Sequence, residues 1–287
     1  WPQAVTALVA GAALSVSGLQ MQTVFRTPLA GPSVLGISSG ASMGVAFVIL
    51  LSGQIGGIAL SRLGFVGELA MTIAAIVGSL SVMALIVYVS QRVKGNVTLL
   101  IIGVMIGYVA NAIIGVLKFF SVEEDIRAYV IWGLGSFSRV SGNQMMLFVC
   151  IMAVLIPLSF LLIKTLNLLL LGDGYARNLG LNIKRARLLV ITSAGILIAI
   201  VTAYCGPITF LGLAVPHLCR AIFQSSDHRI LMPGVVLAGA ALALLCNLIA
   251  RMPGFEGALP VNSVTALNGA PVVASVLFRK RNDDFSE

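Results

Sequence analysis

The sequence predicts an all-α, polytopic membrane protein, and its composition and its hydrophobic pattern both point to this class. Of the 287 residues, 59% are hydrophobic and only 10% are charged, with a mean hydropathy of +1.04. Soluble domains carry about 25% charged residues, so this chain has too little polar surface to be one. Apolar runs of about 17–25 residues, the length of a bilayer-spanning helix, recur along the whole chain.

These runs predict nine membrane spans. Their approximate bounds are Val5–Phe25, Val34–Leu51, Val66–Val89, Leu99–Phe120, Met145–Ile163, Leu188–Cys205, Ile208–Phe223, Ile230–Ala250 and Val261–Phe278. The segment Ser121–Gln144, between the fourth and fifth spans, is too rich in glycine and polar residues to cross a bilayer, so we expect a re-entrant or surface helix there. Prolines such as Pro207 and Pro216 predict bent helices, which transporters tolerate where the helices line a cavity.

The basic residues predict which side of the membrane each loop occupies. The net charge is +8, but the lysines and arginines fall in short loops between spans, which indicates topology and not a nucleic-acid partner. With the C-terminus in the cytoplasm, 13 of the 18 basic residues lie on that side and the acidic triplet Glu123–Asp125 lies on the other. Trp1 then lies outside. An odd number of spans that starts outside without a methionine predicts that at least one N-terminal helix precedes these residues.

The motifs that would identify an enzyme are missing. The sequence contains no G-x-x-x-x-G-K-[ST] phosphate loop, no G-x-S-x-G and no H-E-x-x-H. The four cysteines (Cys150, Cys205, Cys219 and Cys246) lie in or at the ends of apolar runs and are expected to be small buried hydrophobes, and His217 with Cys219 is too small a set for a metal site. Charged residues also avoid the centres of the spans, which counts against an ion-driven carrier. If the protein pumps, its energy must therefore enter from another polypeptide.

The loop Lys164–Arg187 is the candidate for a contact with such a polypeptide. Asp173 is a favourable helix N-cap and Gly180 a favourable C-terminal stop, so Gly174–Leu179 is predicted to be a short capped helix. Two interpretations stay open from the residues alone. The loop is either a basic tether that fixes orientation or a docking element for a cytoplasmic partner.

The stretch GAALSVSGLQMQTVFRTPLAGPSVLGISSGASMG resembles the signature of FecCD-type permeases, the membrane subunits of ABC importers for iron chelates, haem and vitamin B12. The resemblance continues, in the family's order, through WGLGSFS, LLLLGDGYARNLGL, GPITFLGLAVPHLCR, DHRILMPG and LPVNSVTALNGAPV. It implies a type II ABC importer permease fold with ten spans, of which about nine are visible here. Residues 1–287 would form one transmembrane domain, with 164–187 as its cytoplasmic coupling loop.

The same resemblance implies partners and functional residues. It implies a homodimer in the bacterial inner membrane, with two cytoplasmic ATP-binding subunits that hold ATP and Mg and with one periplasmic binding protein. No cofactor or metal would be bound by this chain. The residues that match the element coupled to the ATPase are Gly172, Asp173, Gly174, Ala176, Arg177 and Gly180. The residues that match the cytoplasmic gate are Thr27, Pro28, Leu29, Gly95 and Asn96, with Thr27 where the family usually has asparagine. Arg251 matches an arginine that pairs with an acid of the binding protein.

Alternatives stay open both for the substrate and for the transport class. We expect a metal chelate, either a ferric siderophore or haem, and keep vitamin B12 as the alternative. A secondary transporter driven by an ion gradient is the more remote alternative. A purely structural scaffold is weaker still, because it would give no reason for so many helix breaks.

Overall fold

A computed structural model describes residues 1–27, 30–51, 65–93, 96–140, 142–251, 259–269 and 271. Within these ranges the regular structure is entirely helical, which confirms the predicted fold class. The helices are α1 (Pro2–Phe25), η1 (Pro32–Leu35), α2 (Ile37–Ala46), η2 (Phe47–Leu51), α4 (Phe65–Arg92), α5 (Asn96–Phe120), α6 (Glu123–Gly133), η4 (Phe137–Arg139), α7 (Gly142–Phe160), α8 (Ile163–Leu170), α9 (Asp173–Asn178), α10 (Ile183–Cys205), α11 (Leu211–Phe223) and α12 (His228–Ile249). A further helix covers residues 261–269.

Five of the described helices are long and apolar enough to cross a bilayer, namely α1, α4, α5, α10 and α12. A sixth span results if α7 and α8 are taken together, although the pair is bent by 46°. Two predicted spans are shorter than expected. The predicted span Val34–Leu51 is divided into η1, α2 and the π-helical segment η2, and α11 begins only at Leu211. The last predicted span, Val261–Phe278, lies only partly within the described residues.

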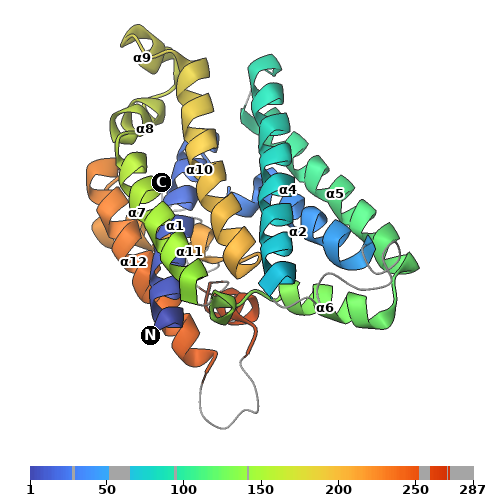
Figure 1. Ribbon diagram of the computed structural model, residues 1–287. Helices are drawn as coiled ribbons and strands as arrows, with labels where there is room; N and C mark the ends of the chain where they lie inside the picture. The colour runs from blue at the N-terminus through green and yellow to red at the C-terminus, as the bar shows by residue number, and fades with distance from the viewer. Residues whose placement is uncertain are drawn as a thin grey trace.

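The helix α1 runs through the middle of one group of helices and packs against α7, α10, α11 and α12 (Figure 1). Glycines make the closest of these contacts possible. A Cβ atom on Gly18 would lie 1.7 Å from the carbonyl oxygen of Gly212, and one on Gly11 would lie 2.3 Å from that of Gly239. The sequence therefore brings the backbones of α11 and α12 directly onto α1, as small residues do in membranes.

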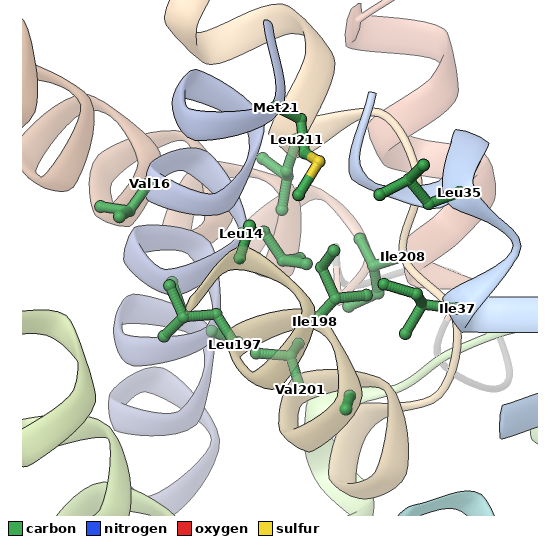
Figure 2. Close-up of a cluster of buried hydrophobic side chains, with 14 of the residues drawn as sticks. Leu14, Val16, Met21, Leu35, Ile37, Leu197, Ile198, Val201, Ile208 and Leu211 are labelled. Atoms are coloured by element: carbon green, nitrogen blue, oxygen red, sulfur yellow. The ribbon is translucent and has the colours of Figure 1, made fainter. Parts of the chain in front are cut away.

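A second group contains α2, α4 and α5, and α10 packs against both α1 and α4. Apolar side chains fill the junction between the two groups (Figure 2). Leu14 of α1, Ile198 of α10, and Leu35 and Ile37 at the start of the second group are each no more than 1% exposed. Burial of side chains of this size contributes about 1.5–3 kcal/mol each where water is the alternative environment. In a membrane the gain comes mainly from close packing.

The two ends of the molecule differ (Figure 1). One end carries α8 and α9. The other end carries the N-terminus, α6 and the end of α12. Within Ser121–Gln144 the structure places α6, a helix of 11 residues, so the expectation that this segment does not form a span is confirmed.

Candidate functional site: the α8–α9 loop and the end of α1

The helix α9 is short and is closed at both ends by glycine. Gly172 precedes it with φ of 103°, and Gly180 follows it with φ of 85°. At the C-terminal end the Gly180 N–H donates to the Arg177 carbonyl at 2.9 Å, and the Leu181 N–H donates to the Ala176 carbonyl at 3.0 Å. This pair of bonds is a Schellman motif, in which glycine adopts the left-handed conformation at no steric cost. The predicted stop at Gly180 is therefore confirmed.

The predicted N-cap is wrong by one residue. The structure places Gly172 at the N-cap, and Asp173 is the first residue of the helix Asp173–Asn178, where the sequence predicted Gly174–Leu179. The Asp173 carboxylate does not cap the helix because it pairs with two arginines instead. Its negative charge in the first turn still interacts favourably with the helix dipole.

The residues of α9 divide into an anchored side and an outward side. Ala176 is fully buried and holds the helix against the protein. Tyr175 is 72% exposed, and Arg177 and Gly174 are exposed as well. A Cβ atom on Gly174 would meet nothing within 4 Å. Of the six residues predicted for coupling, Ala176 therefore faces inward and cannot form part of a contact surface.

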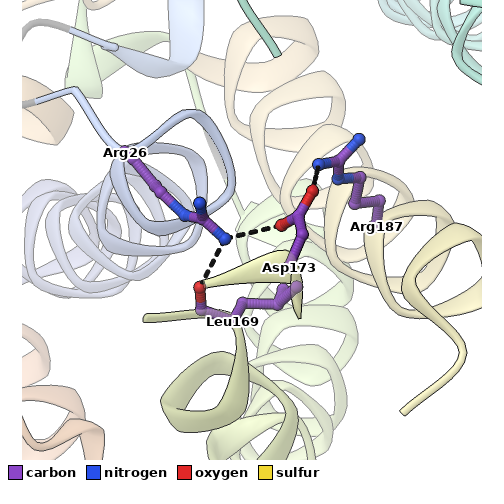
Figure 3. A network of polar contacts seen from close by, with 4 residues as sticks. All are labelled: Arg26, Leu169, Asp173 and Arg187. Atoms are coloured by element: carbon purple, nitrogen blue, oxygen red, sulfur yellow. Dashed lines mark hydrogen bonds and ion pairs between the residues drawn. The ribbon is translucent and has the colours of Figure 1, made fainter. Parts of the chain in front are cut away.

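Asp173 connects three helices (Figure 3). Its Oδ1 accepts a hydrogen bond of 2.6 Å from Nη2 of Arg26, the residue that follows α1. Its Oδ2 accepts from Nη2 of Arg187, in the second turn of α10. The same Arg26 nitrogen also donates to the carbonyl of Leu169 in α8, at 3.0 Å. These pairs could not be predicted from the sequence, since Arg26 and Asp173 are 147 positions apart.

A second polar cluster connects α1 with α8 and α12. Nε2 of His228 lies 2.8 Å from the Thr23 hydroxyl, and its Nδ1 lies 2.7 Å from Oδ1 of Asn167. The Asn167 amide in turn donates to Asp227 at 2.6 Å. Asp227 caps α12 by accepting from the Arg229 N–H, and this bond, followed by the one from Asn167, lowers the pKa of its carboxyl group. The motif DHRILMPG contains Asp227 and His228, but the sequence did not predict their contacts with Thr23 and Asn167, although a histidine and an asparagine flanking apolar runs were a usable signal.

The predicted gate residues are only partly described. Thr27 is half-buried, and its carbonyl accepts from the Ala30 N–H at 3.2 Å, which closes a turn directly after Arg26. Pro28, Leu29 and Gly95 lie outside the described residues. Asn96 begins α5, and its side chain is likewise outside them.

Arg251 lies at the opposite end of the molecule from α9. It directly follows the last turn of α12, is exposed, and donates its N–H to the Leu248 carbonyl at 3.1 Å. This end also carries the N-terminus and α6 (Figure 1). The structure therefore separates Arg251 from α9, and the contact of Arg251 with a binding protein stays a prediction.

The cysteines were predicted with one error. Cys205, Cys219 and Cys246 are buried, whereas Cys150 is exposed because it lies on the outward face of α7. Among the residues that the structure describes, no group of three or more His, Cys, Asp or Glu side chains could hold a metal ion.

Comparisons with known proteins agree with this arrangement. The model of the FecCD transport family matches residues 1–279. The vitamin B12 import system permease protein BtuC of Citrobacter koseri is 37% identical over 284 residues, which cover 98% of this chain and 82% of that protein. The hemin transport system permease protein HmuU of Yersinia pestis is 35% identical over 281 residues, with the same two coverages.

The fold has a close match among solved structures. A metal-chelate type ABC transporter in an inward-facing conformation superposes with a TM-score of 0.86 at 29% sequence identity, covering 97% of this chain and 85% of that one. The family model spans nearly the whole chain, and the relatives exceed 30% identity over the same length. The chain therefore belongs to the FecCD transport family, the membrane-spanning permease subunits of ABC importers.

Proposed function

We propose that this chain is the permease of an ATP-driven importer that moves a metal chelate, a ferric siderophore or haem, from the periplasm to the cytoplasm. ATP would be hydrolysed by separate subunits that dock on α9. The observation that carries this proposal is that α9 has one anchored side and one exposed side. Ala176 and Asp173 fix the helix to the protein, while Tyr175 and Arg177 face outward. A mobile tether would need no such anchored side.

The charge distribution supports a cytoplasmic position for α9. Arg26, Arg177 and Arg187 all belong to the α9 end. The acidic first turn of α6, with Glu123, Glu124 and Asp125, lies at the other end. Positive charge is retained on the cytoplasmic side of bacterial inner-membrane proteins. In this proposed orientation the exposed Arg251 would lie at the periplasmic face, where a binding protein would dock.

The substrate class rests on the relatives. One relative is named for vitamin B12 and another for hemin, at 37% and 35% identity, and the solved structure is of a metal-chelate type transporter. Two of these three names fit a metal chelate in the sense of haem or a siderophore, so this class stands first and vitamin B12 second.

The test is uptake by the complete complex in proteoliposomes. The permease would be reconstituted with its ATP-binding subunits and its binding protein, and uptake of a radiolabelled ferric siderophore, haem or cobalamin measured with and without ATP. We expect ATP-dependent uptake of an iron chelate. ATP-dependent uptake of cobalamin alone would support the alternative substrate, and uptake by the permease alone on an ion gradient would refute the importer.

The assembly can be tested separately. We propose a homodimer in which the exposed apolar face of α5 contributes to the surface between the two copies, with lipid covering the remainder. Val97, Tyr108 and Val116 are each at least 59% exposed on this helix. Native mass spectrometry of the detergent-solubilised complex should show two permease chains with two ATP-binding subunits. A complex with one permease chain would contradict the homodimer.

A further inference from the structure

The helix α9 and the turn at Thr27 are connected through one pair of side chains. Arg26 follows the last residue of α1 and directly precedes Thr27, and its guanidinium contacts both Asp173 and the Leu169 carbonyl (Figure 3). Asp173 is the first residue of α9. A displacement of α9 therefore acts directly on the residue from which the turn begins.

We propose that the Arg26–Asp173 pair is the connection through which movement of α9 reaches Thr27, one of the predicted gate residues, and this inference rests on the proposed docking function of α9. Both residues are positioning residues in this scheme. Neither needs to contact the substrate.

The backbone of Arg26 supports this assignment. Its φ of 51° and ψ of 34° lie in the left-handed region, which is uncommon for a residue with a side chain. This conformation ends α1 and sets the direction in which the chain continues toward Thr27. The contacts with Asp173 and Leu169 hold the side chain of a residue whose backbone is otherwise unfavourable. Loss of the pair would therefore change the direction in which the chain leaves Arg26 toward Thr27.

A buried contact close to this pair holds the end of α1 in place. Thr23, three residues before Arg26, meets His228, and His228 meets Asn167, two residues before Leu169. His228 is fully buried, whereas the side chains of Arg26 and Asp173 are 38% and 40% exposed. The end of α1 is thus held to α8 twice, through His228 and through the bond from Arg26 to Leu169, and to α9 through the Arg26–Asp173 pair. Only the Arg26–Asp173 link lies where a docked partner could alter it.

Arg187 provides a matched comparison. It pairs with the same carboxylate, but it belongs to α10, which directly follows the loop, and it has no sequence connection to the turn. Removing Arg187 therefore breaks an ion pair of Asp173 without breaking the link to Thr27.

The first experiment uses the complete complex with its ATP-binding subunits and binding protein. The variants are Asp173→Asn, Arg26→Gln, the double variant and Arg187→Gln, and the quantity measured is substrate transported per ATP hydrolysed. Because an exposed ion pair contributes only weakly, its removal should reduce the coupling without abolishing it. We therefore expect the ratio of substrate transported to ATP hydrolysed to fall about three- to five-fold in Asp173→Asn and Arg26→Gln. The double variant should be no worse than either single variant, because each single substitution already removes the same Arg26–Asp173 contact. Arg187→Gln should stay within about 1.5-fold of the unaltered complex.

The second experiment does not depend on transport. Thr27→Cys is introduced into the permease alone in lipid nanodiscs, and the rate of labelling by a water-soluble maleimide is measured. Asp173→Asn and Arg26→Gln should change this rate, and Arg187→Gln should not. Equal rates in all variants, or an equal effect of Arg187→Gln in both experiments, would overturn the inference. A complex without ATP-driven uptake would refute the proposed function, while the labelling rates would still decide the connection.

Discussion

Thr23 Oγ1 lies 2.8 Å from Nε2 of His228, and this contact joins the last turn of α1 to the first residue of α12. Both side chains are buried, with exposures of 1% and 0%. Leaving a buried polar group without its hydrogen-bond partner costs more free energy than the hydrogen bond contributes when it is formed. The contact therefore matters for stability even though it is a single hydrogen bond.

Substitution of Thr23 by valine tests this contact. Thr23→Val keeps the shape of the side chain and leaves His228 without the hydroxyl, so we expect a loss of about 1–3 kcal/mol of stability. Thr72→Val is the matched control, because the hydroxyls of Thr23 and Thr72 both donate to the carbonyl four residues earlier. The control should change stability by less than about 0.5 kcal/mol. Thermal unfolding of the detergent-solubilised protein measures both, and equal shifts would refute the role of His228.

A methyl group at Gly18 tests the close approach of α1 and α11. In Gly18→Ala the added carbon would lie 1.7 Å from the Gly212 oxygen, and backbone has to move to admit it. We expect a loss of about 3 kcal/mol or more. Gly115→Ala on α5 is the control, since its Cβ meets nothing within 4 Å and should stabilise the helix by up to about 1 kcal/mol. If both variants unfold at the same temperature, the helices are not in this contact.

The outward side of α9 is tested at Gly174. Gly174→Glu adds a bulky charge where there is open space, so the permease should fold normally while the affinity for the ATP-binding subunits falls about ten-fold or more. Gly174→Ala should retain most of that affinity. The measurement is the amount of ATP-binding subunit that co-purifies with a fixed amount of permease. Full co-purification and full ATP-driven uptake in the glutamate variant would favour the tether interpretation. Ala176 is unsuitable for this test because it is fully buried.

The outer face is tested at Arg251, which is exposed at the end of α12. If Arg251 pairs with an acid of the binding protein, Arg251→Glu should slow association about ten-fold at low salt, because charges at the rim of an interface act mainly on the association rate. The difference should shrink at about 0.5 M salt, where such charges are screened. A partner variant with the acid changed to arginine should restore part of the rate. An unchanged rate at low salt would show that Arg251 is only an interfacial arginine.

The sequence predicted the fold class well because hydrophobicity over about 20 residues is a local property. It predicted the second span less well. The break between η1 and α2 falls at Gly36, whose φ is 73°, and a Cβ there would lie 2.9 Å from the Gly103 carbonyl oxygen on α5. The need for glycine at position 36 is set by a helix almost 70 positions away, so the local hydrophobic pattern cannot predict it.

The site shows the same limit. Gly180 was predicted correctly because its helix stop depends on neighbouring residues alone. Asp173 was placed at the wrong helix position because its use is decided by Arg26, and a sequence read in order cannot show that the two meet. The end of α1 and the start of α9 lie side by side only in the folded chain.

The glycine contacts of α1 limit how this protein can change shape. The backbones of Gly11 and Gly18 touch those of Gly239 and Gly212, so α1, α11 and α12 cannot slide past one another without separating, and they should move as one rigid body. Gly40 and Gly78 fix α2 to α4 in the same way. Between α4 and α10, in contrast, the space at Gly195 is filled by the flexible side chain of Met83. A side chain can change its rotamer where two backbones in contact cannot, so the boundary between α4 and α10 is where the two groups of helices can shift relative to each other.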